Sequence, residues 1–231
     1  MDKAVLRNFA IESRKDLMEK IDRKIKLFYV DEEFKKDNRG DVIVLSNDKH
    51  SLTLTKEEDS NRDKLINRIV ELGYVQVVEE AAYTWFNRII AIRYMEINDY
   101  LPLTSNNQSL NIRVLSSRDG SASPEILKFS NLTRNDLDLN FNKEFFSTLN
   151  NEESKFKYIL LLVCKKLGKV IPQVFDGVTD YIDLLIPDNM LSDTGFVRKL
   201  INTIDESNFS QVEIIGWLYQ YYNQTEKDRA M

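Results

Sequence analysis

Glycine and proline are scarce along this chain, and their scarcity restricts the folds open to it. The sequence has 231 residues, of which 7 are glycine and 4 are proline. Glycine supplies the left-handed backbone conformation that tight turns need, and proline interrupts helices and strands. Because both residue types are so rare, few tight turns are expected, and the chain is predicted to fold into long helices.

Apolar residues recur at helical spacing in several segments of the chain. Leu6, Phe9, Leu17, Ile21 and Ile25, for example, fall near one face of the first segment, and the rest of it is mostly charged. The predicted helices span residues 2–29, 60–72, 76–98, 152–167, 192–204 and 210–222, with short helices between 125 and 149. More than half of segment 76–98 is apolar, so we expect this helix to be the central and most buried element.

Residues that commonly cap helices stand near several of the predicted helix ends. Ser60 is placed to cap the second helix, and Gly73 follows its last turn. Asn151 precedes the helix at 152–167, and the spacing of Ser210 and Glu213 is typical of a capping box. These signals fix the predicted helix boundaries.

Two short β-rich segments surround a polar loop and predict a hairpin. They are Asp41–Leu45 and Ser51–Thr55, whereas residues 30–40 are polar and residues 103–124 form a long loop that contains a short apolar stretch. The predicted fold is mainly α, a multi-helix domain with a small β-hairpin near residues 41–55. We expect this domain to cover residues 1–223 and a polar tail to follow at 224–231.

The charge balance limits the classes of partner. Lys plus Arg number 32 and Asp plus Glu number 37, which gives a net charge of −5. An autonomous DNA-binding domain normally carries an excess of positive charge. The whole surface therefore cannot be a DNA footprint, although a local basic patch remains open.

Several features favour the cytoplasm and exclude a membrane segment. Cys164 is the single cysteine, so no disulfide can form within the chain. The first residues are charged and lack the apolar stretch of a signal peptide. The longest apolar run, 158–164, is far too short to span a bilayer.

Few residues are suited to catalysis or metal binding. The chain has one histidine, His50, in a predicted turn, and Cys164 lies within the apolar stretch of a helix, where we interpret it as a core residue. One His and one Cys exclude the usual zinc ligand sets. Glu33 and Lys35 have the spacing of a nuclease motif but lie in a charge-dense segment, which indicates a solvated surface. We therefore predict no catalytic, cofactor-binding or metal-binding residue in this chain.

Five segments together resemble one protein family. They run in order through the sequence: Ala4–Ala10 (AVLRNFA), Ala81–Pro102 (AAYTWFNRIIAIRYMEINDYLP), Arg113–Ser117 (RVLSS), Asp180–Leu191 (DYIDLLIPDNML) and Ile214–Tyr222 (IIGWLYQYY). This pattern resembles the N-terminal region of the adenine-specific DNA methyltransferases of the BREX phage-defence system, called PglX, and covers about the first fifth of such a protein.

The resemblance implies a parent enzyme that transfers a methyl group from S-adenosylmethionine to adenine in DNA. That chemistry needs a Gly-containing cofactor turn and an Asn/Asp-Pro-Pro-Tyr/Phe loop that binds the flipped base. The chain has no Pro-Pro pair, and both Phe175–Gly177 and Ile186–Asn189 are interpreted as plain turns. The family's catalytic motifs are expected downstream, so this region is predicted to be inactive alone.

Four arginines are the candidate contacts to DNA. Arg7 and Arg14 lie on the first predicted helix, where residues 1–29 contain eight basic and five acidic side chains, and Arg113 and Arg118 lie in a Ser-containing loop predicted to be flexible. The alternative explanation is that each of these four arginines is ordinary surface charge. In this accessory role the region would position DNA or the methyltransferase domain.

A second role is a protein-interaction module that recruits another BREX component without touching DNA. Residues 170–197 contain five Asp and no Lys or Arg, namely Asp176, Asp180, Asp183, Asp188 and Asp193. We expect this acidic stretch to face away from DNA and to meet either solvent or a basic partner surface.

Two further predictions concern residues inside the five segments that carry the family resemblance. Arg88 and Arg93 lie on the helix predicted to be most buried, so they need partners, for which Glu96 and Asp99 are candidates. Gly216 is predicted to permit a close approach between helices.

Overall fold

Helices dominate the architecture, as the scarcity of glycine and proline predicts. The computed structural model describes residues 2–101, 103–105, 108–109, 112–129, 141–175 and 181–227. In order, its elements are α1 (Lys3–Leu27), β1 (Lys35–Arg39), β2 (Val42–Ser46), β3 (Ser51–Thr55), α2 (Lys56–Leu72), α3 (Tyr74–Ile97), β4 (Thr104–Ser105), β5 (Gln108–Ser109), α4 (Glu125–Phe129), α5 (Lys143–Thr148), α6 (Glu152–Gly168), α7 (Pro172–Phe175), α8 (Tyr181–Leu184), α9 (Phe196–Thr203), the 3-10 helix η1 (Glu206–Ser210) and α10 (Glu213–Lys227).

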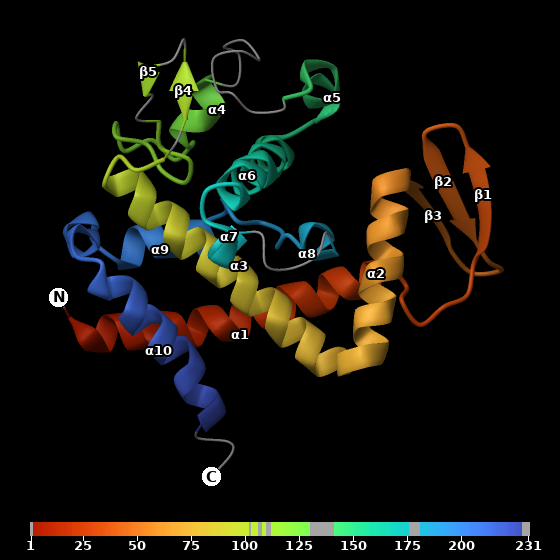
Figure 1. Cartoon of the computed structure of the whole chain (residues 1–231), viewed down its shortest axis with the longest axis horizontal. Helices are drawn as coiled ribbons and strands as arrows, with labels where there is room; N and C mark the ends of the chain where they lie inside the picture. The colour runs from red at the N-terminus through yellow and green to blue at the C-terminus, as the bar shows by residue number, and fades with distance from the viewer. Residues whose placement is uncertain are drawn as a thin grey trace.

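Helix α3 is the centre of the molecule. Trp85, Phe86, Ile89 and Ile92 are fully buried, which confirms the prediction that this helix is the most buried element. α3 packs against α1, α2, α7, η1 and α10. Figure 1 shows α3 crossing α1, and α10 crossing the N-terminal half of α1.

Helix α1 buries the apolar stripe that its sequence predicts. Leu6, Phe9, Leu17, Ile21 and Ile25 all face the core. The main hydrophobic cluster unites side chains from α1 through α10, so the first and last helices belong to one core.

A three-stranded antiparallel sheet stands at one end of the molecule, beyond α2 (Figure 1). The predicted hairpin is confirmed as β2 and β3, with Val44 opposite Thr53. Ile43, Leu45 and Leu54 form a small core of their own beneath it. Strand β1 is an addition that the sequence did not predict, because its five residues, KKDNR, are all exposed and polar.

Several helix ends differ from the predicted ones. α2 begins at Lys56, where Thr55 and Glu58 form a capping box, so the assignment of Ser60 as the cap was wrong. Gly73 follows the last turn as expected, with φ of 90°. Asn151 caps α6 as expected, by accepting a hydrogen bond from the Ser154 amide.

The two C-terminal helices start later than predicted. α9 begins at Phe196, and α10 begins at Glu213 after η1. Ser210 does not cap α10, because its hydroxyl donates to the Ser207 carbonyl within η1. α10 also continues through Lys227, beyond the predicted start of the tail. Gly216 is exposed, and a Cβ there would meet nothing within 4 Å, so the prediction of a close helix approach was wrong.

In the part of the chain that the structure describes, every helix is either too short or too polar to span a bilayer.

Candidate nucleic-acid interface

The predicted loop Arg113–Arg118 is held against α3 by a buried ionic network. Arg93 and Glu96, one turn apart on α3, are both fully buried, and Arg93 Nη1 lies 2.5 Å from Glu96 Oε1. Ser116 completes this centre, because its hydroxyl donates to Glu96 (2.9 Å) and accepts from Arg93 (2.8 Å). The predicted pairing of Arg93 with Glu96 is thus confirmed.

The second oxygen of Glu96 fixes the backbone of the loop. Glu96 Oε2 accepts the amides of Val114 and Leu115 at 2.8 and 2.7 Å. A buried carboxylate needs this many donors to replace the water it loses. The family segment on α3 and the family segment at 113–117 therefore form one structural unit.

Glu206, at the start of η1, adds a third segment to the network. Its carboxylate accepts two hydrogen bonds from Arg113, at 2.5 and 2.9 Å, and one from Arg93 at 3.1 Å. The hydrogen bonds from Arg113 lower the pKa of Glu206 below its usual value of 4.5. Burial lowers the pKa of Arg113, but the contact with Glu206 outweighs burial and the net shift is upward. Sequence reasoning missed Glu206, because it lies 113 positions from Arg93 and no local pattern joins them.

Glu125, at the start of α4, holds the outer side of the same loop. It accepts the Arg113 amide at 3.1 Å, the Arg118 amide at 2.7 Å and Arg118 Nη1 at 2.9 Å. Arg118 Nη2 also donates to Asp99 at 3.0 Å. With Glu96 inside and Glu125 outside, the loop is anchored on both sides, in contrast to the flexible segment predicted.

A hollow of about 330 Å³ opens beside this loop. Arg113, Arg118 and Arg198 line it together with Ser116 and Ser117. The side chain of Arg118 is 42% exposed, whereas that of Arg113 is only 12% exposed. Of the two loop arginines, Arg118 is thus the one that solvent reaches, in a setting rich in hydrogen-bond donors.

The two candidate arginines of α1 have different surroundings. Arg7 is exposed. Arg14 is buried, pairs with Glu79 at 2.8 Å and lies over the ring of Tyr222. The structure therefore brings Arg113 and Arg118 to one hollow, whereas Arg7 and Arg14 lie elsewhere, on α1.

Most other basic side chains of α1 also have partners within the protein. Three of them form ion pairs one turn away, a fourth reaches Asp188 and a fifth lies over an aromatic ring: Lys20–Asp16, Arg23–Glu19, Lys26–Asp22, Lys24–Asp188 and Lys3–Trp217. The basic excess of this helix is thus largely compensated by neighbouring groups.

Two aspartates of the acidic stretch are paired in the same way. Asp183 pairs with Arg88, whose Nη2 also donates to the Phe175 carbonyl, so Asp183 is the partner that the buried Arg88 needs. Asp188 bridges Lys24 and Lys157, which hold its pKa below the usual value although burial alone would raise it. Asp193 is exposed, and Asp176 and Asp180 lie outside the described residues.

The remaining chemically interesting side chains have ordinary structural surroundings. Cys164 is buried, and desolvation raises the pKa of its thiol to about 12, which makes it unreactive. His50 Nδ1 lies 3.0 Å from Glu32, and its ring stacks on Tyr29. No group of three or more His, Cys, Asp or Glu side chains in the described part of the chain is placed to hold a metal ion.

Comparison with known proteins supports the resemblance seen in the sequence. No protein-family model matches the chain. It is 32% identical over 254 residues to the adenine-specific methyltransferase PglX of Lacticaseibacillus casei (strain Zhang), which covers 100% of this chain and 20% of that protein. It is 36% identical over 174 residues to the adenine-specific methyltransferase BrxX of Escherichia coli O9:H4 (strain HS), which covers 74% of this chain and 14% of that protein.

The chain spans a fifth or less of the length of these curated relatives. All five family segments lie within the stretch that matches PglX, since the match covers the whole chain. The resemblance predicted from these segments is confirmed: the chain is related over its full length to one region of the adenine-specific methyltransferase PglX, and over 74% of its length to one region of BrxX.

Proposed function

We propose that this chain is the N-terminal accessory region of an adenine-specific DNA methyltransferase of a BREX system, inactive alone, and that it helps to position DNA or the methyltransferase domain. The similarity of the whole chain to PglX carries this proposal. In this proposal the parent enzyme binds DNA and uses S-adenosylmethionine as its cofactor. Its further partners are other BREX proteins, and it acts in the cytoplasm.

The domain boundaries belong to the same proposal. We infer that residues 1–223 act as one unit and that the residues after 223 lead toward the methyltransferase domain. The core cluster that joins α1 to Tyr222 supports this reading.

The four arginines proposed to contact DNA differ in how exposed they are. Arg14 is buried and Arg113 is mostly buried, each in an ion pair, so a phosphate would have to displace Glu79 or Glu206 to reach them. Arg118 and Arg7 are more exposed and are the better candidates. The serines beside Arg118 add hydroxyl donors of the kind that commonly bind phosphate oxygens.

Fluorescence anisotropy with a short labelled duplex tests this proposal. We expect binding at about 50 mM salt that weakens strongly at about 200 mM salt, because phosphate contacts release counterions. The double variant Arg7→Glu/Arg118→Glu should bind more weakly and show a smaller salt dependence. Arg39→Glu is the matched control, because Arg39 is also exposed but lies on the distant sheet. Equal affinity of the double variant and the wild type would remove these two residues from the proposal.

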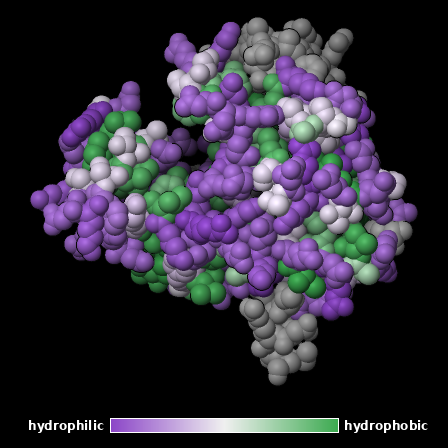
Figure 2. Space-filling model, turned by 180° about the vertical axis from the view of Figure 1, so that it is seen from behind, coloured by the Kyte–Doolittle hydropathy of each residue, from purple (hydrophilic) through white to green (hydrophobic). Residues whose placement is uncertain are grey.

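An exposed apolar corner favours the alternative, a protein-interaction module. Val70, Leu72 and Val75, at the junction of α2 and α3, are 80%, 43% and 61% exposed. Figure 2 shows hydrophobic surface at the lower left, where these two helices meet. Clustered exposed apolar side chains often mark protein interaction sites.

Calorimetric titration against each purified protein of the same defence system tests the alternative. A partner whose affinity falls in the Val70→Ser/Val75→Ser variant, combined with no DNA binding at low salt, would establish the interaction module and exclude the DNA-positioning role.

A further inference from the structure

A groove of about 520 Å³ lies between the first half of α3 and the end of α10. Leu72 at the end of α2 and Gln76 on α3 line one wall, and Tyr222 and Asn223 on α10 line the other. In Figure 1 the start of α3 and the end of α10 lie on the same side of α1, which both helices cross. Arg14 of α1 also lines the groove, so the first and last helices of the chain both contribute to it.

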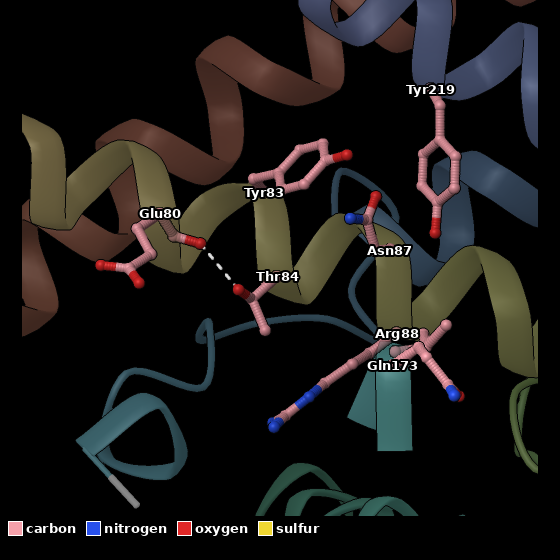
Figure 3. A pocket seen from close by; sticks show the side chains of 8 residues that line it. Glu80, Tyr83, Thr84, Asn87, Arg88, Gln173 and Tyr219 are labelled. Carbon is pink, nitrogen blue, oxygen red and sulfur yellow. Dashed lines mark hydrogen bonds between the residues drawn. The ribbon is translucent and has the colours of Figure 1, made fainter. Parts of the chain in front are cut away.

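Tyr83 joins the two walls of this groove. Its ring lies 5.5 Å from that of Tyr222 and 6.1 Å from that of Tyr219, so aromatic packing holds α3 against α10. Figure 3 shows Tyr83 from α3 and Tyr219 from α10 in a neighbouring cavity of about 460 Å³, which Tyr83 also lines. The shape of the groove is therefore set by packing within the chain.

The four charged side chains of the groove lining are paired with one another. Arg14 pairs with Glu79 at 2.8 Å. Arg68 pairs with Glu80 at 3.0 Å, and Glu80 also accepts a hydrogen bond from Tyr181. Two cations and two anions leave the lining without net charge. Such a lining offers no attraction to a phosphate backbone, but it suits an uncharged polypeptide.

The groove is continuous with the exposed apolar corner at the junction of α2 and α3. Leu72 belongs to both surfaces, because it lines the groove and is 43% exposed. Val70 and Val75 are more exposed still, and Figure 2 shows this corner as hydrophobic surface at the lower left. An apolar corner that continues a neutral groove is typical of a surface that another polypeptide covers.

Polar groups along the same surface are open to a polypeptide backbone. The carboxamides of Gln76 and Asn223, on opposite walls, make no hydrogen bond to the described residues. No side chain caps the start of α3 at Gly73, so the amides of its first turn lack helical partners. Carboxamides and free amides together provide the donors and acceptors that an extended backbone can pair with.

The polypeptide that follows α10 in the parent protein is the occupant that the geometry favours. The match to this chain covers 20% of PglX, so about four-fifths of that protein lies outside it. α10 continues to Lys227, one turn beyond Asn223 in the groove wall. A segment attached there has a high effective concentration at the groove, because its tether is short. A separate protein would have to bind without that advantage.

We propose that the groove and the apolar corner dock an uncharged, extended segment of the polypeptide that leads from α10 to the methyltransferase domain. An apolar side chain of this segment covers Leu72 and Val75. Its backbone pairs with the carboxamides of Gln76 and Asn223 and with the open amides of α3. The inference rests on the proposed function, which places the methyltransferase domain after residue 223, and it adds the surface that holds that domain.

Hydrogen exchange of the 231-residue chain and of the full-length parent protein tests the proposal. We expect the amides of residues 73–77 to exchange at least about 10-fold more slowly in the parent, because docking covers the start of α3. Residues 35–39 are the internal control, because strand β1 is exposed and lies on the distant sheet. Equal exchange of residues 73–77 in the two proteins would overturn the proposal.

Two valines of similar exposure provide matched variants of the full-length parent. Val75→Asp should speed the exchange of residues 220–224, on the opposite wall, at least about 5-fold, because it ejects the docked segment. Val212→Asp should leave that exchange unchanged, because Val212 is 59% exposed against 61% for Val75 but does not line the groove. Circular dichroism confirms that both variants fold. Unchanged exchange of residues 220–224 in a folded Val75→Asp variant would contradict the docking.

Other occupants of the groove would give different results, and each would overturn the proposal. Protection of residues 73–77 that rises with the concentration of the chain alone would assign the groove to a second copy. Protection that appears in the parent only when another purified protein of the defence system is added would assign it to a separate partner.

Failure of the docking and failure of the proposed function are distinguishable. A parent gene that encodes no methyltransferase domain after residue 231 would refute both. Equal exchange of residues 73–77 in a parent that has this domain refutes the docking alone, and the DNA-binding test of Arg7 and Arg118 stays independent of it.

Discussion

Glu96 is the single residue on which the loop Arg113–Arg118 depends most. Its two oxygens accept hydrogen bonds from Arg93, from the Ser116 hydroxyl and from the amides of Val114 and Leu115. Because the side chain is fully buried, water cannot replace any of these donors. The carboxylate therefore determines the position of the loop and compensates the buried charge of Arg93.

Replacing this carboxylate should have a large effect on stability. We expect Glu96→Gln to lower the free energy of unfolding by about 3–5 kcal/mol, because it leaves Arg93 buried without its closest counter-charge. Urea denaturation measures the change. Glu71→Gln removes a carboxylate from an exposed pair with Arg68 and should change the free energy by less than about 1 kcal/mol. A loss of similar size in both variants would show that the buried Arg93–Glu96 pair contributes no more to stability than the exposed Arg68–Glu71 pair.

Glu206 should make the stability depend on pH in the acidic range. Its pKa is lowered in the folded protein, so it binds a proton more readily in the unfolded chain. Its contribution is therefore complete above its usual pKa of 4.5 and is lost as the pH falls through the lower folded value. Thermal unfolding of the wild type and of Glu206→Gln between about pH 7 and pH 3 should show a smaller acid-induced decrease in Tm in the variant. Parallel curves would refute this assignment.

At the scale of elements, helix α2 shows how a cap determines where a helix begins. Thr55 accepts the Glu58 amide, and Glu58 in turn accepts the Thr55 amide. Ser60, four residues inside the resulting helix start, is exposed. The earlier cap adds a full turn to the helix and joins it directly to β3.

The two hydroxyl residues therefore give a direct comparison. Thr55→Ala should destabilise the protein by about 1 kcal/mol, because the Glu58 amide loses the Thr55 hydroxyl that accepts it. Ser60→Ala should be neutral or slightly stabilising, because alanine has the higher helix propensity. Chemical denaturation of both variants is the measurement, and the reverse order of stabilities would place the functional cap at Ser60.

Two glycines should respond in opposite ways to the same substitution. A Cβ on Gly195, just before α9, would lie 2.1 Å from the Asn189 carbonyl oxygen, a backbone atom that cannot move aside easily. Gly195→Ala should therefore cost at least about 2 kcal/mol. Gly216→Ala, inside α10 with open space around it, should stabilise by about 0.5–1 kcal/mol. Calorimetry on both variants should show Tm shifts of opposite sign.

The elements that sequence reasoning predicted are those with a local signal. Helix α3 is recognisable because apolar residues cover more of it than a helix with one exposed face would carry. The start of α6 is recognisable because the capping residue Asn151 precedes a run of helix formers. Strand β1 is not recognisable, because its pairing with β2 is made by the backbone, and its side chains carry no apolar alternation. The contact between Arg113 and Glu206 joins residues 93 positions apart, so it follows from the packed fold alone.

At the scale of the whole molecule, ion pairs within the protein compensate much of the charge that the sequence suggested was available for partners. Arg14, Arg88 and Arg93 are all buried with carboxylates beside them. Asp188 is only partly buried, but it too is paired and ties α1 to α6 through Lys24 and Lys157. Charge counts along the sequence therefore overstate the surface that DNA or a basic protein would meet.

We expect the isolated chain to transfer no methyl group. Its sequence has no Pro-Pro pair for a base-binding loop of the adenine methyltransferase type. Incubation with DNA and S-adenosylmethionine labelled in the methyl group, followed by counting of the DNA, is the measurement. A full-length relative serves as the positive control, and reproducible labelling by the chain alone would refute the accessory role.

The packing of α1 against α10 has a consequence for biosynthesis. α1 is synthesised long before α10, one of the helices that cover it. At translation rates of about 5–20 residues per second, the apolar stripe of α1 waits roughly 10–40 seconds for this partner. During that interval nascent chains expose Leu6 and Phe9, which is when chaperones would engage them and when a truncated product would aggregate.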